Sequence, residues 1–306
     1  ELLAITEMSR EGEKVAIIGG GPAGLAAAYH AQKHGLQATV FEKRETLGGI
    51  VRNVIPGFRI GDDAIDNDIA LIKKTGAEFV MGKEAPDVKE LKAMGFDYIV
   101  LACGAEKKGR LNIEGSVMNV IDFLYAFKNG GELKLGRNVA VVGGGNTAMD
   151  AARAAKRAEG VEKVTLVYRR NRRYMPADLE ELELAIEDGV EFMELASPVK
   201  QANGKLVCNK MKLGDKDASG RRVPVETGET VEVDADTVIA AVGEKVDLDL
   251  LGRYGIAADA YKKGNKKYGD VYVVGDASRG PATVADAIAD AKWVIEDITG
   301  REIVVI

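Results

Sequence analysis

The chain has 306 residues, of which 46% are hydrophobic and 29% charged, and its formal net charge is −6 at pH 7. This composition is typical of a folded α/β protein, and the length corresponds to about two domains of ~150 residues each. The negative charge argues against nucleic acid or an anionic membrane as a partner. No apolar run is long enough to span a bilayer and no signal peptide is visible, so we expect no membrane insertion.

The two cysteines, Cys103 and Cys208, lie far apart in the chain and in different sequence contexts. A disulfide between them is therefore not expected, and a reducing, cytoplasmic location is the default. The chain contains neither a C-x-x-C pair nor a run of residues with the spacing of metal ligands. We predict no metal site.

A glycine-rich turn near the start of the chain suggests a dinucleotide site. Residues 15–18 predict a short buried strand, Gly19, Gly21 and Gly24 follow with G-x-G-x-x-G spacing, and an alanine-rich helix comes next. In this pattern the glycines permit a tight turn, close approach of a pyrophosphate and close packing of helix on strand. The helix N-terminus then offers N–H groups and the positive end of its dipole to the pyrophosphate. An ordinary turn is the alternative interpretation.

The next strand, residues 37–41, ends at a carboxylate, Glu42. Glu42 follows Gly21 by about 20 residues, the spacing expected of an acid that binds ribose hydroxyls. A solvated surface glutamate is the alternative. Farther on, Gly48 and Gly49 suit the close passage of backbone past a ligand. A helix over 62–75, a strand over 78–81, a short helix over 88–94 and a buried strand over 97–105 follow.

The opening pattern then recurs. Residues 137–150 predict a strand, a glycine turn and a helix with Gly143, Gly145 and Ala148 in G-x-G-x-x-A order. The following strand, residues 163–168, ends in Arg169 and Arg170 instead of an acid. Guanidinium groups bind a 2′-phosphate, which a carboxylate would repel, so the first site suits a free ribose and the second suits NADP. A solvated basic loop over residues 169–173 is the alternative.

The remainder of the chain alternates between short strands and helices. We predict a helix over 178–188, an antiparallel meander over 190–233 and a buried strand over 236–243 that resembles residues 98–104. A last core strand over 271–274 leads to Gly275 and Asp276, and a helix over about 284–298 ends the pattern. The stretch 257–270 looks short for its place, which leaves the approach to Gly275 open.

Together these motifs resemble a known family, the two-dinucleotide flavoprotein reductases. The chain is most similar to the FAD- and NADPH-binding small subunit of glutamate synthase and its relatives, and among these to the branch labelled as selenate reductase subunits. The resemblance covers roughly residues 13–300. The motifs that carry it are Phe41-Glu-Lys43, Gly48-Gly49, residues 55–59, Gly143 to Asp150, Tyr168-Arg-Arg170 with Met175-Pro176, Gly275-Asp276, and Gly280 to Val284.

The resemblance implies an α/β fold with two Rossmann-like dinucleotide-binding domains, the second inserted in the first. We expect an FAD domain over 13–118 and 234–306 and an NADPH domain over 119–233. The implied reaction is hydride transfer from NADPH to the flavin, after which electrons leave for an acceptor. No acid–base side chain is required, because the cofactors carry the chemistry and the protein aligns them.

The resemblance also assigns site residues by position. Cys103 is not among them, and we expect it to fill the core. The implied FAD contacts are Gly19, Gly21, Pro22, Ala23, Gly24, Glu42, Lys43, Gly49, Arg52, Gly104, Gly275, Asp276, Ala282, Thr283 and Val284. The implied NADPH contacts are Gly143, Gly145, Asn146, Thr147, Arg169 and Arg170. Gly243, at the end of its strand, is a further predicted cofactor contact.

Reductases of this kind usually carry a cysteine-rich segment that holds iron–sulfur clusters ahead of the first strand, and this chain has no cysteine before Cys103. The resemblance therefore implies an iron–sulfur domain or subunit as the electron exit, and a chain excised from a longer polypeptide. A thioredoxin reductase would need a C-x-x-C and is excluded. Two alternatives stay open, namely a non-catalytic FAD-binding scaffold of a redox complex and an NADPH:ferredoxin-type reductase.

Overall fold

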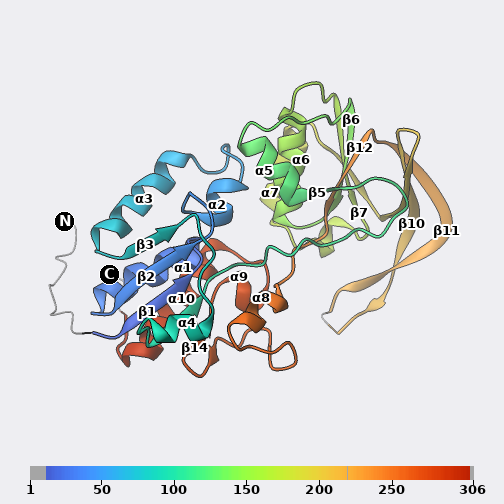
Figure 1. Cartoon of the computed structure of the whole chain (residues 1–306). Coiled ribbons are helices and arrows are strands. Elements are labelled where there is room, and N and C mark those ends of the chain that lie inside the picture. Colours follow the sequence, from blue (N-terminus) through green and yellow to red (C-terminus); the bar gives the residue numbers. More distant parts are fainter. Residues whose placement is uncertain (1–11, 219, 304–306) are drawn as a thin grey trace. The chain divides into compact units, whose positions relative to one another are not determined.

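The computed structural model describes residues 12–218 and 220–303, which divide into two compact units. The first unit contains residues 12–53, 57–107 and 244–303, and the second contains residues 54–56 and 108–243. Each unit is built on a mainly parallel sheet (Figure 1). Among the described residues, no helix combines the length and the apolar character that crossing a bilayer would require.

The first unit has a six-stranded sheet in the order β13-β14-β4-β1-β2-β3, in which β13 pairs antiparallel with β14 and the other neighbours pair in parallel. Its strands are β1 (Lys14–Ile18), β2 (Gln37–Glu42), β3 (Glu78–Met81), β4 (Tyr98–Leu101), β13 (Lys267–Tyr268) and β14 (Val271–Val273). Its helices are α1 (Pro22–Lys33), α2 (Gly49–Asn53), α3 (Asp62–Lys74), α4 (Val88–Ala93), α8 (Leu248–Arg253), α9 (Asp276–Arg279) and α10 (Val284–Thr299).

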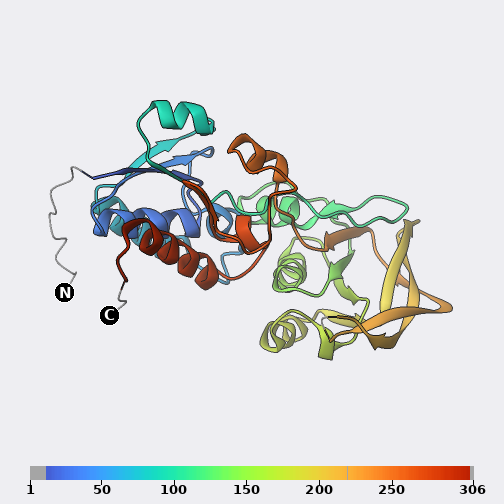
Figure 2. The same ribbon diagram turned by 90° about the horizontal axis from the view of Figure 1, so that it is seen from below.

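The alternation of side chains along β1 builds two cores, one on each face of this sheet. Val15 and Ile17 pack in a cluster with the alanines of α1 and with residues of α10. Figure 2 shows α1 and α10 side by side. Ala16 and Ile18 pack on the opposite face with residues of α4 and α8. Because both faces are covered, the strands are apolar throughout, as parallel strands usually are.

The second unit has a five-stranded parallel sheet in the order β5-β12-β6-β7-β8 and a separate three-stranded antiparallel sheet in the order β11-β10-β9. The parallel strands are β5 (Met118–Asn119), β6 (Asn138–Gly143), β7 (Lys163–Tyr168), β8 (Glu191–Glu194) and β12 (Thr237–Ala241). The antiparallel strands are β9 (Ala196–Ala202), β10 (Lys205–Lys216) and β11 (Arg222–Asp234), and the helices are α5 (Val120–Lys128), α6 (Asn146–Arg157), the 3-10 turn η1 (Arg172–Tyr174) and α7 (Leu179–Glu187).

Here, too, the strands alternate between two cores. Val139 and Val141 of β6 pack with α5, α6 and α7, while Ala140 and Val142 face a cluster that includes Leu206 of the antiparallel sheet. The order β12-β6-β7-β8 repeats the order β4-β1-β2-β3 of the first unit. The two halves are therefore variants of one arrangement, as the recurring glycine turns predicted.

The structure differs from the sequence analysis in three respects. The predicted meander over 190–233 begins with β8, which instead extends the parallel sheet beside β7. Helices α2, α5, α8 and α9 were not predicted. The domain limits also differ, since residues 54–56, 108–118 and 234–243, expected in the first domain, lie in the second unit. The reason is that β5 and β12 hydrogen-bond in the sheet of β6, which no local sequence signal reveals.

A cavity-forming substitution can test whether the two units unfold separately. Leu166 of β7 is fully buried in the helix-covered core of the second unit. We expect Leu166→Ala to destabilise that unit by about 2–5 kcal/mol. The single tryptophan, Trp293, lies on α10 of the first unit. In urea titrations the circular-dichroism midpoint should fall while the Trp293 fluorescence midpoint stays. An equal fall of both midpoints would mean that the units unfold as one.

Candidate functional site

The first glycine turn, between β1 and α1, is shaped by backbone contacts that admit no side chain at two positions. A Cβ at Gly24 would lie 1.9 Å from the Gly19 carbonyl oxygen, and a Cβ at Gly19 would lie 2.5 Å from the Ala102 carbonyl oxygen. Gly19 also has φ 112°, which other residues rarely adopt. These two glycines therefore set how closely the helix and the neighbouring strand approach, as predicted.

Gly21 differs from these two, because the protein itself leaves room for a side chain there. A Cβ at Gly21 would meet only the Gly49 Cα, at an ordinary 3.8 Å. Gly21 is the N-cap of α1, which has no side-chain cap and no acidic residue in its first turn. Uncapped N–H groups beside an open backbone surface fit a pyrophosphate. The predicted contacts Gly21 and Gly49 are thus brought together.

Glu42 is held against this turn and is only 5% exposed. One carboxylate oxygen accepts the Gly20 N–H at 2.7 Å and the other accepts the Arg44 N–H at 2.9 Å. Each oxygen keeps further acceptor capacity, which fits a ribose diol. The structure therefore adds a role that the sequence did not reveal, since Glu42 also fixes the glycine turn itself.

Lys43 and Gly104 line a cavity of about 240 Å³ at the carboxyl ends of β2 and β4, together with Cys103, Glu106, Lys107, Asp247 and Leu250. Burial by itself would raise the pKa of Glu106. Ion pairs of its carboxylate with Lys43, at 2.8 Å, and with Arg44, at 3.0 Å, have the larger effect, and the pKa is lowered. Burial raises the pKa of the Cys103 thiol to about 11. Cys103 is therefore protonated at neutral pH, in agreement with a packing role.

The loop from Gly275 to Thr283 lies beside the first glycine turn. A Cβ at Gly275 would lie 3.0 Å from the Ala23 Cβ, so these predicted contacts, distant in sequence, are neighbours. The Asp276 carboxylate accepts the Ala282 N–H at 3.1 Å, and burial raises its pKa. Thr283 caps α10, the next helix. A half-buried acid with one backbone donor fits a ligand that supplies hydroxyl donors, such as the ribitol chain.

The stretch 257–270, whose approach to Gly275 the sequence left open, is held against this loop by hydrogen bonds. The Tyr261 hydroxyl donates to the Ser278 carbonyl oxygen at 2.8 Å, and the Gly264 N–H donates to the same oxygen at 2.7 Å.

Arg52, a predicted cofactor contact, is turned into the protein, where its Nε donates to the Leu47 carbonyl oxygen at 2.7 Å and its guanidinium pairs with Asp66. Its predicted contact with the cofactor stays a prediction.

The second glycine turn, between β6 and α6, repeats the geometry of the first. A Cβ at Gly143 would lie 2.3 Å from the Ala241 carbonyl oxygen, whereas a Cβ at Gly145 would meet nothing within 4 Å. Gly145 is the N-cap of α6, which likewise has no side-chain cap and no acid in its first turn. This turn also fits a pyrophosphate, with Thr147 in the first turn of the helix.

The two turns differ at the strand that follows. The ring of Tyr168, at the end of β7, lies against Gly144, just as Glu42 lies against Gly20. Tyr168 thus takes the position that Glu42 has in the first turn. Arg169 is exposed, but Arg170 is buried, with its Nε donating to the Arg222 carbonyl oxygen at 2.9 Å. The predicted pair of phosphate ligands is therefore split, with only Arg169 at the surface.

Residues 171–178 fold back over the second turn. The Ala177 N–H donates to the Gly144 carbonyl oxygen at 3.0 Å. Asn146, a predicted cofactor contact, exchanges two hydrogen bonds of 3.0 Å with Asp178, one through its amide nitrogen and one through its amide oxygen. Sequence reasoning did not predict this cover. Gly243, the last of the predicted contacts in this unit, lies two residues after the end of β12 and has φ 93°, which other residues rarely adopt.

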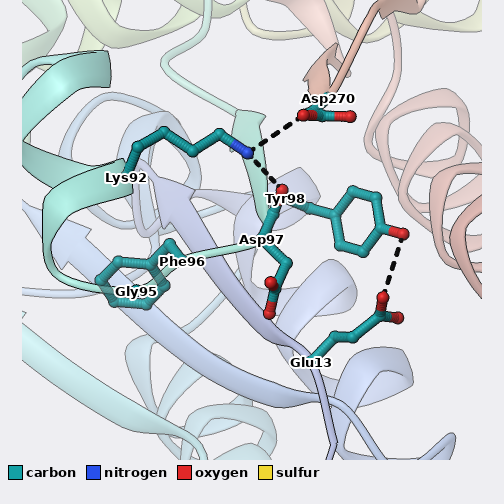
Figure 3. Close-up of a pocket in the computed structure, with 7 residues that line it drawn as sticks. All are labelled: Glu13, Lys92, Gly95, Phe96, Asp97, Tyr98 and Asp270. Atoms are coloured by element: carbon teal, nitrogen blue, oxygen red, sulfur yellow. Dashed lines mark hydrogen bonds and ion pairs between the residues drawn. The ribbon is translucent and has the colours of Figure 1, made fainter.

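A larger cavity, of about 420 Å³, opens at the amino ends of β1, β4 and β14 (Figure 3). Lys92 contacts the Asp97 carbonyl oxygen and, at 3.2 Å, the Asp270 carboxylate, and the Tyr98 hydroxyl donates to Glu13 at 3.4 Å. Open α/β sheets bind their ligands at the carboxyl ends of the strands, which is the opposite edge. We therefore assign this cavity to neither cofactor.

Among the described residues, no group of three or more His, Cys, Asp or Glu side chains could hold a metal ion.

Two glycine turns of this geometry, each at the carboxyl edge of a parallel sheet, define a protein that binds two dinucleotides. The family model described as pyridine nucleotide-disulphide oxidoreductase matches residues 13–291, and the chain belongs to this family. It also belongs with the small chains of glutamate synthase. It is 32% identical to "Glutamate synthase [NADPH] small chain" of Escherichia coli (strain K12), over 95% of this chain and 69% of that one.

A second relative is more similar in sequence but much longer. The chain is 43% identical to "Putative oxidoreductase YgfK" of Escherichia coli (strain K12), over 94% of this chain, and it spans only 29% of that relative. A solved structure, FprA of Mycobacterium tuberculosis in complex with NADPH, shares the fold with a TM-score of 0.78 and 21% identity, over 94% of this chain and 84% of that one. The predicted fold class, family, oxidoreductase class and cofactor pair of FAD and NADPH are confirmed.

The raised pKa of Asp276 predicts a stability effect that depends on pH. Burial of the ionised carboxylate costs stability at neutral pH, and this cost disappears below the unfolded pKa of about 3.9, where the group is protonated in both states. Asp276→Asn should therefore stabilise the cofactor-free protein at pH 7, and the gain should vanish as the pH falls to about 4. Urea midpoints at both pH values measure this. A gain independent of pH would contradict burial as its cause.

Proposed function

We propose that this chain is the NADPH-oxidising module of a larger flavoprotein system, which passes electrons from NADPH through FAD to an iron–sulfur domain or subunit. When bound, FAD accepts a hydride from NADPH and can release the electrons singly. The observation that carries the proposal is the pair of matched glycine turns with different neighbours. The first turn has Glu42 against its central glycine, and the second has Tyr168 followed by Arg169.

The first unit is proposed to bind FAD. The α1 N–H groups beside Gly21 and Gly49 would hold the pyrophosphate, and Glu42 would accept bonds from the adenosine ribose. Asp276 would accept bonds from the ribitol chain, and the N-terminus of α10 at Thr283 and Val284 would favour negative charge on the flavin. The neighbouring Ala23 and Gly275 support one continuous site for these groups within the unit.

The second unit is proposed to bind NADPH, with its pyrophosphate at Gly145 and Thr147 on the N-terminus of α6. An intact second turn argues against the alternative of a non-catalytic FAD scaffold. No side chain is proposed to transfer a proton in the hydride step, so the protein's part is to bind and align.

The electron exit is proposed to lie outside these residues. Cys103 and Cys208 are both free, they lie in different units, and burial raises the pKa of each thiol, to about 11 and about 12. Two separated cysteines cannot supply the four thiolates that an iron–sulfur cluster usually needs. The much greater length of the relative YgfK leaves room for a cluster-binding segment. We also propose a cytoplasmic location, to which free thiols are suited.

Arg169 and Arg170 should contribute differently to the choice of nucleotide. A charge-assisted bond to the 2′-phosphate contributes about 1.5–3 kcal/mol. Arg169→Ala should therefore lower kcat/KM for NADPH by about tenfold or more and leave NADH unchanged. Arg170→Ala should mainly destabilise the β10–β11 hairpin, because its Nε bonds the Arg222 carbonyl oxygen. Steady-state kinetics with both nucleotides decide this. Loss of the preference in Arg170→Ala alone would assign the phosphate to Arg170 instead.

The exit route can be tested with the chain as it stands. Purified protein reconstituted with FAD should be bleached by NADPH in stopped-flow measurements and should reduce ferricyanide, which takes electrons directly. Turnover with disulfides or selenate should be negligible, and transfer to a one-electron physiological acceptor should return when a cysteine-rich segment or subunit is restored. Absence of bleaching would favour the scaffold. Rapid selenate or disulfide reduction by the chain alone would show that the exit route is misplaced.

A further inference from the structure

Asp290 of α10 is a fully buried carboxylate that no motif of the sequence singled out. Buried aspartates are rare unless their charge is paired and their oxygens are hydrogen-bonded. The contacts of Asp290 lead almost entirely to one place, the loop from Gly275 to Thr283, which carries Asp276 and the other proposed flavin contacts.

Its first contacts fix the start of this loop. One oxygen of Asp290 accepts the Gly275 N–H at 3.0 Å and faces the Ser278 hydroxyl at 3.4 Å. Gly275 has φ 61° and ψ −146°, a conformation that essentially only glycine adopts. Asp290 thus holds this glycine, which immediately precedes Asp276, in the conformation that sets the direction of the backbone at the start of the loop.

Its other contacts are two cations. Lys266 Nζ lies 2.8 Å from the second Asp290 oxygen, and the Arg279 guanidinium pairs with the same oxygen. Arg279 also reaches Asp286 at 3.4 Å. Asp286 in turn forms the capping box with Thr283 at the start of α10. The loop is therefore tied at its start through Gly275, in its middle through Arg279 and at its end through Thr283.

We propose that Asp290 is a positioning residue for the FAD site, which holds the loop 275–283 ready so that Asp276 and the N-terminus of α10 face the cofactor. The proposal rests on the proposed placement of FAD in the first unit. Its physical basis is preorganisation, because a loop that is already ordered loses less conformational entropy when the ligand binds. The Asp276 carboxylate accepts a hydrogen bond from the Ala282 N–H, which belongs to the same loop. The position of this carboxylate therefore depends on the loop backbone that Asp290 holds.

Asp297 provides a matched control on the same helix. Its carboxylate also pairs with a lysine and accepts a hydroxyl, from Lys267 at 2.6 Å and Tyr272 at 2.7 Å. These partners belong to β13 and β14, ahead of the loop. Asp297→Asn therefore removes an ion pair from the same helix, a more exposed one, without removing a contact with residues 275–283. Arg279→Gln is a milder second variant, which cuts only the middle tie.

The first measurement needs no cofactor. In hydrogen–deuterium exchange of the cofactor-free chain, the peptide covering residues 275–283 should exchange at least tenfold faster in Asp290→Asn than in the unmutated protein, and less so in Arg279→Gln. Asp297→Asn should leave this peptide unchanged, although it lowers the melting temperature. Equal exchange in Asp290→Asn and the unmutated protein would overturn the positioning role. If Asp290→Asn does not fold, Arg279→Gln carries the same test.

The second measurement is FAD affinity, determined by quenching of flavin fluorescence. Asp290→Asn should raise the Kd at least tenfold, whereas Asp297→Asn should leave it within about twofold of the unmutated value. An unchanged Kd in Asp290→Asn would refute the link to the cofactor. If the unmutated protein itself binds no FAD, the proposed function fails, and the exchange experiment still decides whether Asp290 orders the loop.

Discussion

The close contact between helix and strand at each glycine turn is the constraint on which both units depend. A Cβ at Gly24 would lie 1.9 Å from the Gly19 carbonyl oxygen, so α1 starts directly against the end of β1. This contact aims the uncapped N–H groups of the helix at the carboxyl edge of the sheet. It also brings Ala23 next to Gly275, so that the loop before α10 reaches the same edge. A side chain at Gly24 would push α1 away from β1, and with it the neighbouring residue Ala23 away from Gly275.

The two units show how one arrangement can present different side chains at the same position of a glycine turn. The strand order and the contact of a strand-end side chain with the central glycine are the same in both. In the first unit that side chain is Glu42, whose charge is satisfied by two backbone N–H groups. In the second it is the neutral ring of Tyr168, and a cation, Arg169, follows at the surface. Exchanging an acid for an aromatic ring thus removes the repulsion that a 2′-phosphate would meet.

Two buried carboxylates of the first unit are stabilised in the same way, by hydrogen bonds from the backbone. Glu42 and Asp290 each accept a backbone N–H from a glycine, Gly20 and Gly275, and so hold the two segments that are proposed to contact the cofactor. Asp276 is less fully compensated, and burial raises its pKa. An incompletely paired acid is costly in a fold, and it is the type of group that a ligand can satisfy. Asp276, with a single backbone donor, therefore differs from Glu42, which has two, and from Asp290, which has one and is also paired with two cations.

Local patterns in the sequence were sufficient for the repeated strand, turn and helix units, because short apolar strands and glycine spacing follow from local chemistry. They also led to the predictions for Glu42 and for the contrast at Arg169, whereas the prediction for Asp276 came from the family resemblance. Tertiary structure alone decided the rest. The place of β12 depends on pairing with β6 across almost a hundred residues of chain, and the burial of Arg170 depends on a hairpin that follows it. The role of Asp290 depends on Lys266 and Gly275, which only the folded chain brings to α10. Such contacts join residues far apart in sequence, and no local period or spacing encodes them.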